Sequence, residues 1–112
     1  MGLVAMGIPE EVAASMAEHF DATMGSCILS LYRSAAQPVL ANLGAQLAQG
    51  ELPPGLVIVA TEDEYTGTPA MCLEVADSLG ADFIRLKGLG HWWMFDGAGI
   101  VADALVEHWH SV

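Results

Sequence analysis

Basic residues are scarce in this sequence of 112 residues, which has three of them against fourteen acidic ones. The net charge of −11 would repel a nucleic-acid backbone or an anionic membrane surface, so we exclude both as partners. Long apolar runs are missing too. The opening stretch MGLVAMG lacks the basic flank of a secretory signal, and Met6 stands where a myristoylation signal has Ser or Thr. We therefore expect a soluble, cytoplasmic protein.

Cysteine is also rare, and Cys27 and Cys72 match no zinc or redox spacing. We interpret each as a small buried hydrophobic residue, which fits a reducing compartment. His108 and His110 are further candidates for metal ligands, but residues two apart point to different sides of a helix. The sequence therefore predicts neither a metal site nor a cofactor.

Apolar residues, by contrast, make up 54% of the sequence, which is enough for the core of one small domain. In the first half they recur at helical spacing, and we expect helices near residues 9–21, 23–34 and 38–50. Asp21 or Thr23 would cap the second of these helices. The first half is thus predicted to be helical.

The second half changes character at residues 56–60 (LVIVA), a short apolar run rich in β-branched side chains and typical of a buried parallel strand. A helix follows, with Thr68 as its cap, Pro69 in its first turn and Gly80 at its end. Residues 82–86 (DFIRL) predict a second strand. Together these elements form one right-handed βαβ unit with two parallel strands, so the fold class is α/β.

Apolar stripes predict which helix faces are buried. A last helix is expected after the second strand, with Asp96 as its cap. The stripes consist of Met71, Val75 and Leu79 in the helix between the strands, and of Ile100 or Val101, Leu105 and Trp109 in the last helix.

Each predicted strand is followed by a residue capable of acid–base chemistry, Asp63 after the first strand and His91 after the second. Because parallel neighbours end at the same edge of a sheet, the two loops should lie side by side. An aspartate bonded to one imidazole nitrogen fixes the tautomer and stabilises the imidazolium, which leaves the other nitrogen to accept a proton from a nucleophile. The sequence thus predicts the base half of a catalytic triad.

The order of strand, loop aspartate, helix, strand, the motif GLGHWW at 88–93 and closing helix resembles the end of an α/β-hydrolase. The resemblance covers residues 36–112 as the carboxyl-terminal part of the core, and residues 1–35 resemble the end of a helical cap. It implies a partial α/β-hydrolase fold that acts on an ester or related small carbonyl substrate. Asp63 would be the triad acid and His91 the general base.

The resemblance decides how several residues are interpreted. Without it, Asp63 would be an ordinary solvated loop acid and His91 a structural histidine. Trp92, Trp93 and Tyr65 are candidates for substrate binding, although large aromatic side chains more often serve packing.

The nucleophile of that family is missing from this sequence. It sits on a strand-to-helix elbow, Gly-x-Ser-x-Gly or a variant, and no serine here has glycines at those positions. Cys72 has no elbow around it either. The chain alone is therefore expected to be inactive in acyl transfer, with the nucleophile contributed by a missing part.

A sheet of two parallel strands is too small to stand alone, so something must cover it. Either a missing amino-terminal portion completes the domain, or copies of the chain pair their strand edges into a homo-oligomer. The edge of residues 56–60 and the high apolar content favour the second possibility. Two hypotheses remain: a hydrolase fragment, or a non-catalytic self-assembling or binding module derived from that fold.

Overall fold

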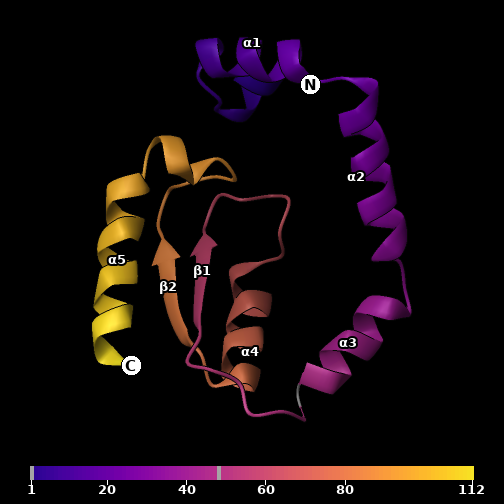
Figure 1. The fold of residues 1–112 in the computed structure, drawn as a ribbon. Helices are drawn as coiled ribbons and strands as arrows, with labels where there is room; N and C mark the ends of the chain where they lie inside the picture. The colour runs from indigo at the N-terminus through magenta and orange to yellow at the C-terminus, as the bar shows by residue number, and fades with distance from the viewer. Residues whose placement is uncertain (1, 48) are drawn as a thin grey trace. The chain divides into compact units, whose positions relative to one another are not determined.

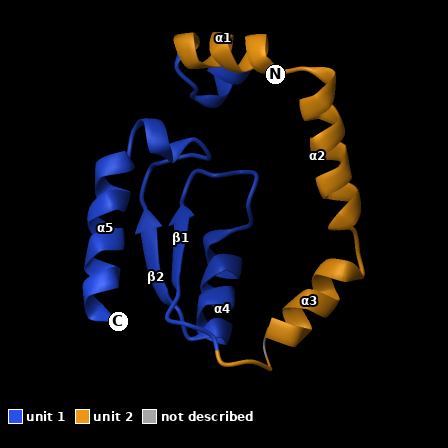
Figure 2. Ribbon diagram, viewed as in Figure 1, with its two compact units in different colours: residues 1–9, 52–112 blue, residues 10–51 orange. Residues whose placement is uncertain are grey.

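The computed structural model describes residues 2–47 and 49–112, which form a mixed α/β structure with five helices and one sheet of two parallel strands (Figure 1). The chain divides into two compact units, a strand unit of residues 1–9 and 52–112 and a helical unit of residues 10–51 (Figure 2). The boundary after residue 35 that the family resemblance implies falls inside the helical unit. Among the described residues, none of the helices is both long and apolar enough to span a bilayer.

The helical unit contains the three helices expected from the first half of the sequence. They are α1 (Glu10–His19), α2 (Ala22–Ser34) and α3 (Val39–Leu47). Asp21, rather than Thr23, caps α2, because its side chain accepts a hydrogen bond of 2.8 Å from the Met24 N–H. The third helix ends earlier than predicted, and residue 48, within the predicted range, lies outside the described residues.

The strand unit contains the predicted βαβ arrangement. Its elements are β1 (Leu56–Ala60), α4 (Pro69–Leu79), β2 (Asp82–Leu86) and α5 (Ala98–Ser111), with short 3-10 helices at Leu3–Met6 and Trp93–Phe95. The strands pair in parallel, with Leu56 opposite Asp82 and Ala60 opposite Leu86. Thr68 caps α4 by accepting a hydrogen bond from the Met71 N–H, and Gly80 ends that helix in the left-handed conformation, at φ +63°. The sequence predictions for these elements are confirmed.

The predicted cap of the last helix was wrong. Asp96 ends the short 3-10 helix, and Gly97 takes the cap position of α5 without a side-chain hydrogen bond. The reason is a tight turn in which the Gly97 N–H donates to the Trp93 carbonyl at 2.6 Å. A β-carbon at position 97 would have to displace the end of the Leu89 side chain and would crowd the Trp93 carbonyl oxygen, so this turn favours glycine over a polar cap.

The hydrophobic core of the strand unit lies between the sheet and α5. Ala60, Leu86 and Val101 are buried at its centre. Partly buried hydrophobic residues packed against them are Ile58, Ile84, Leu89, Trp93 and Leu105. Side chains alternate along each strand, so Val59 is directed to the other face, where α4 lies against the sheet.

The apolar stripe predicted for α4 does not face the sheet. Met71, Val75 and Leu79 are 58%, 50% and 40% exposed, whereas Ala76 is buried. A small side chain allows the helix to approach the strands closely, so the buried face of α4 is selected by size rather than by hydrophobicity. The prediction for this face was wrong, and it leaves an apolar surface beside β1.

The stripe predicted for α5 was correct only in part. Of the two alternatives, Val101 is buried and Ile100 is exposed. Leu105 packs against the core, but Trp109 is 63% exposed and His108 is buried in its place. Positions 101, 105 and 108 are spaced by four and then three residues, which is the repeat of one helix face. His108 therefore belongs to the same buried face of α5 as Val101 and Leu105.

Candidate active site

The loops that follow the two strands are bound to each other by backbone hydrogen bonds. The Thr61 N–H donates to the Leu86 carbonyl at 3.1 Å, and the Glu62 N–H donates to the Leu89 carbonyl at 2.9 Å. The Thr61 hydroxyl also accepts a hydrogen bond of 2.8 Å from the Gly88 N–H. These bonds hold the two loops side by side at the carboxyl edge of the sheet.

Asp63 lies in the first of these loops and is held by hydrogen bonds to both carboxylate oxygens. Its Oδ1 accepts from the Tyr65 N–H at 2.8 Å, and its Oδ2 accepts from the Thr66 hydroxyl at 2.9 Å. The same Oδ2 lies 3.0 Å from Nδ1 of His91. The side chain is only 7% exposed, so it is well shielded from solvent within this chain.

The environment of Asp63 stabilises its ionised form. Burial alone would raise the pKa of this carboxyl group, but the hydrogen bonds from Tyr65, His91 and Thr66 and the attraction of the imidazolium outweigh burial and lower the pKa below its ordinary 3.8. Asp63 is therefore a carboxylate at neutral pH and can accept a hydrogen bond from the Nδ1–H group of His91.

His91 is placed by the second loop, which turns at Gly88 in the left-handed conformation, at φ +76°. Its ring meets the Tyr65 ring edge-on, with centroids 5.1 Å apart, and the Trp92 ring at 5.4 Å. The side chain is 37% exposed. Within the part of the chain that the structure describes, Nδ1 makes the one side-chain hydrogen bond of this residue, so Nε2 is available to a ligand.

A cleft of about 320 Å³ lies beside this pair. The residues around it come from β1, both loops and the first turn of α4. They are Ile58, Ala60, Asp63, Thr66, Cys72, His91, Trp92, Trp93 and Met94. Trp92 and Trp93 line the cleft, while Tyr65 contacts the histidine ring without lining it. Trp92 Nε1 is buried and has no hydrogen-bond partner among the described residues.

Within the strand unit, no serine is among the described residues that line the cleft beside His91. The hydroxyls of Ser34, Ser78 and Ser111 donate to main-chain carbonyls of their own helices. Cys72 lines the cleft, but it lies in the first turn of α4, where its N–H bonds to the Thr68 carbonyl. The site therefore holds an acid and a base, and it has no strand-to-helix elbow.

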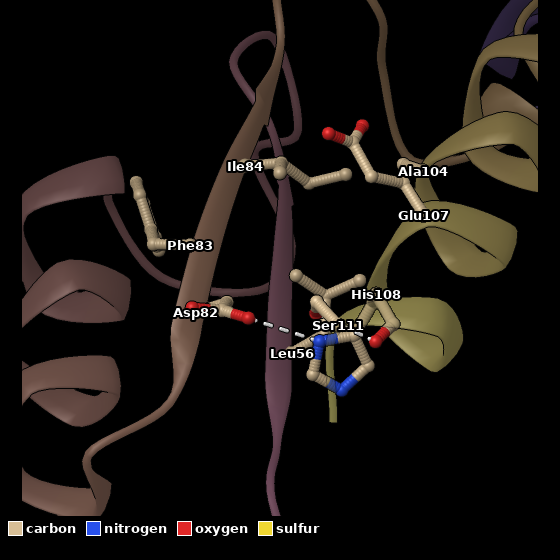
Figure 3. A pocket seen from close by; sticks show the side chains of 8 residues that line it. All are labelled: Leu56, Asp82, Phe83, Ile84, Ala104, Glu107, His108 and Ser111. Carbon is tan, nitrogen blue, oxygen red and sulfur yellow. Dashed lines mark hydrogen bonds and ion pairs between the residues drawn. The ribbon is translucent and has the colours of Figure 1, made fainter.

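A second aspartate–histidine pair, which sequence reasoning missed, involves Asp82, the first residue of β2, and His108 of α5 (Figure 3). His108 Nδ1 is 3.0 Å from Asp82 Oδ2, in a cavity of about 320 Å³ between β2 and the end of α5. The Ser111 hydroxyl donates to the His108 carbonyl instead of the imidazole. The spacing of Val101, Leu105 and His108 was the signal that could have revealed the pair.

The two pairs differ in the access that they give to the imidazole. The His108 side chain is 8% exposed and that of His91 is 37% exposed. His108 joins the end of α5 to the start of β2, so the pair has a structural role. In the described residues no group of three or more His, Cys, Asp or Glu side chains is arranged to hold a metal ion.

Comparison with known proteins adds no family assignment. No protein-family model, curated protein or solved structure matches this chain. The geometry of Asp63, His91 and the adjoining cleft is therefore what supports a function for this chain.

Proposed function

We propose that this chain is the carboxyl-terminal part of an α/β-hydrolase that hydrolyses an ester or related small carbonyl compound. In this proposal residues 36–112 belong to the core and residues 1–35 to the end of a cap. Asp63 and His91 form the acid–base half of the triad. The single observation that supports the proposal most is the 3.0 Å hydrogen bond between Asp63 Oδ2 and His91 Nδ1 beside an aromatic-lined cleft.

His91 acts through Nε2 in this proposal. As the attacking hydroxyl oxygen bonds to the carbonyl carbon, its proton passes to Nε2, and the Asp63 carboxylate stabilises the resulting imidazolium. The same proton then passes from Nε2 to the leaving alcohol oxygen as the carbon–oxygen bond breaks. Trp92 and Trp93 would form the apolar walls against which the substrate lies.

The nucleophile and the oxyanion hole belong to a polypeptide segment outside the described residues. Without that segment, we expect His91 to act on water. We therefore expect the chain alone to show at most weak hydrolysis assisted by a general base, without the acyl-enzyme step of a complete triad.

The direct test compares the hydrolysis of a short-chain aryl ester by the purified chain, by His91→Ala and by Asp63→Asn. We expect His91→Ala to lower the rate by about tenfold, below the roughly 10²- to 10⁴-fold effect of a general base in a complete enzyme. Asp63→Asn should lower the rate less, because it disturbs the orientation of the base without removing it.

The matched control is His110→Ala, which removes an exposed imidazole from α5 and should leave the rate unchanged. This control matters because any free imidazole attacks activated esters to some extent. Equal rates for the unsubstituted chain and His91→Ala, or equal losses in His91→Ala and His110→Ala, would contradict a special role for His91.

A non-catalytic binding or self-assembling module is the second candidate, favoured by the amount of exposed apolar surface. Neither α2 nor α3 contains a buried residue, although Leu31 and Leu43 are among their apolar side chains. Such surfaces mark interaction sites when they are contiguous. Sedimentation at micromolar concentration separates the candidates, because an assembly module forms a defined oligomer whether or not His91 is intact.

A further inference from the structure

The outer edge of β1 has backbone groups that no other strand in the sheet satisfies. The Asp82 N–H donates to the Gly55 carbonyl and the Thr61 N–H donates to the Leu86 carbonyl, so the odd-numbered residues of β1 face β2. The N–H and C=O groups of Leu56 and Ile58 therefore point to the opposite edge. Since the sheet has the order β1-β2, this edge is open to an added strand.

The two edges of the sheet differ in how they are protected against pairing. A solvent-facing edge strand usually has charged residues, proline or a bulge that prevent association with another strand. The strand at the other edge, β2, has charged side chains at Asp82 and Arg85, whereas β1 has none among its five residues. Its sequence, LVIVA, is that of a strand with neighbours on both sides.

An apolar hollow lies next to this open edge. It has a volume of about 240 Å³ and is lined by Val57, Gly67, Met71, Cys72 and Val75. In an added strand, alternate side chains would point toward α4 and enter this hollow. The stripe of α4 that fails to face the sheet would then be covered.

Charge indicates what kind of strand fits here. Residues 52–80, which include β1 and α4, contain no Lys, Arg or His. Glu62 and Glu64 follow β1, and Glu74 lies on α4 next to Val75 of the exposed stripe. A second copy of this chain would bring the same acidic groups against each other, whereas a segment with basic flanks would be attracted.

We propose that the open edge of β1 binds an extended, apolar segment of another polypeptide with lysine or arginine residues at its ends. The segment adds to the sheet through the backbone of Leu56 and Ile58 and inserts side chains beside Val75. This binding does not depend on the ester chemistry proposed for Asp63 and His91, so either proposal can fail without the other.

The experiment titrates the full chain into a fluorescent peptide of alternating valine and threonine flanked by lysine pairs and follows the anisotropy. We expect a Kd on the order of 10–100 µM, which is modest because only a short edge is paired. The same peptide with glutamate flanks should bind at least about tenfold more weakly, and added salt should reduce this difference. Methylation of the central backbone nitrogens should abolish binding.

Two sets of variants test the location. Val75→Glu should weaken binding of the lysine-flanked peptide by about tenfold or more, whereas Ile100→Glu, at another exposed apolar position on α5, should have no effect. The variant Glu74→Gln keeps the hollow and removes a charge beside it, so it should weaken binding of the lysine-flanked peptide and leave that of an uncharged peptide unchanged.

The proposal is overturned if the lysine-flanked peptide fails to bind the folded chain or binds Val75→Glu and Ile100→Glu equally. It is also overturned if sedimentation shows that β1 is occupied by a second copy, which Val75→Glu would dissociate and Ile100→Glu would not.

Discussion

The Asp63 carboxylate shows how neighbouring groups set the charge of one residue. Its oxygens accept from the Tyr65 N–H, the Thr66 hydroxyl and His91, and two of these three partners lie within three residues of it in the sequence. The loop therefore orients the carboxylate through its own hydrogen bonds, independently of His91. The pairing with His91 uses an acceptor that is already fixed.

The lowered pKa of Asp63 predicts a particular dependence of stability on pH. A carboxyl group whose pKa is lower in the folded state stabilises the protein above its unfolded-state pKa, and this contribution is lost as pH falls through the folded-state pKa. Asp63→Asn should therefore reduce the free energy of unfolding at neutral pH, and the difference from the unsubstituted chain should shrink as pH falls below 3.8. Urea denaturation across this range measures the difference.

Glu64→Gln is the matched control for this prediction, since Glu64 is an exposed acid in the same loop. It should change the free energy of unfolding little at any of these pH values. A difference between Asp63→Asn and the unsubstituted chain that stays constant down to the lowest pH would show that the Asp63 charge is not stabilised by folding.

At the scale of elements, the turn from the His91 loop into α5 depends on Gly97. A β-carbon there would meet the Leu89 side chain and lie 3.2 Å from the Trp93 carbonyl oxygen. We expect Gly97→Ala to lower the free energy of unfolding by about 1–3 kcal/mol, as overpacking of a well-packed site does. Chemical denaturation measures this loss.

The control for this prediction lies two residues further along. Gly99 is in α5, and a β-carbon there would have nothing within 4 Å. Gly99→Ala should therefore raise the free energy of unfolding by about 0.5–1 kcal/mol through helix propensity. Equal effects of the two substitutions would contradict the role assigned to the turn.

Elements were easier to predict than the faces that they bury. The run LVIVA at 56–60 and the order Thr68, Pro69 and Gly80 determine local structure through backbone preferences, and those predictions are confirmed. The buried face of α4 depends on how closely it approaches the sheet, which favoured Ala76 over the larger Val75. Hydrophobic spacing alone contains no information about that distance.

The candidate site shows the same division. Parallel topology was enough to predict that Asp63 and His91 lie together, and their hydrogen bond confirms this. The contributions of Thr66 and of the Tyr65 N–H depend on the exact path of the loop, which sequence spacing does not determine. The pair of Asp82 and His108 was missed because it joins two elements at a register that only three-dimensional packing sets.

At the scale of the whole molecule, the two ends of the strands in the strand unit have different properties. At their carboxyl ends lies an accessible histidine beside a cleft, and at their amino ends lies a buried histidine that joins α5 to β2. Among the described residues, the sheet between them has two strands, and many large apolar side chains are exposed. Binding of further polypeptide is therefore part of both functions considered for this protein.

The central claim is that the Asp63 carboxylate fixes the orientation and the tautomer of His91. Nitrogen NMR of the imidazole ring tests it most directly, because protonated and unprotonated ring nitrogens have well-separated chemical shifts. We predict that the neutral ring of His91 has its proton on Nδ1 in the unsubstituted chain and that Asp63→Asn removes this preference. A neutral His91 with its proton on Nε2, or the same tautomer mixture in both proteins, would contradict the account.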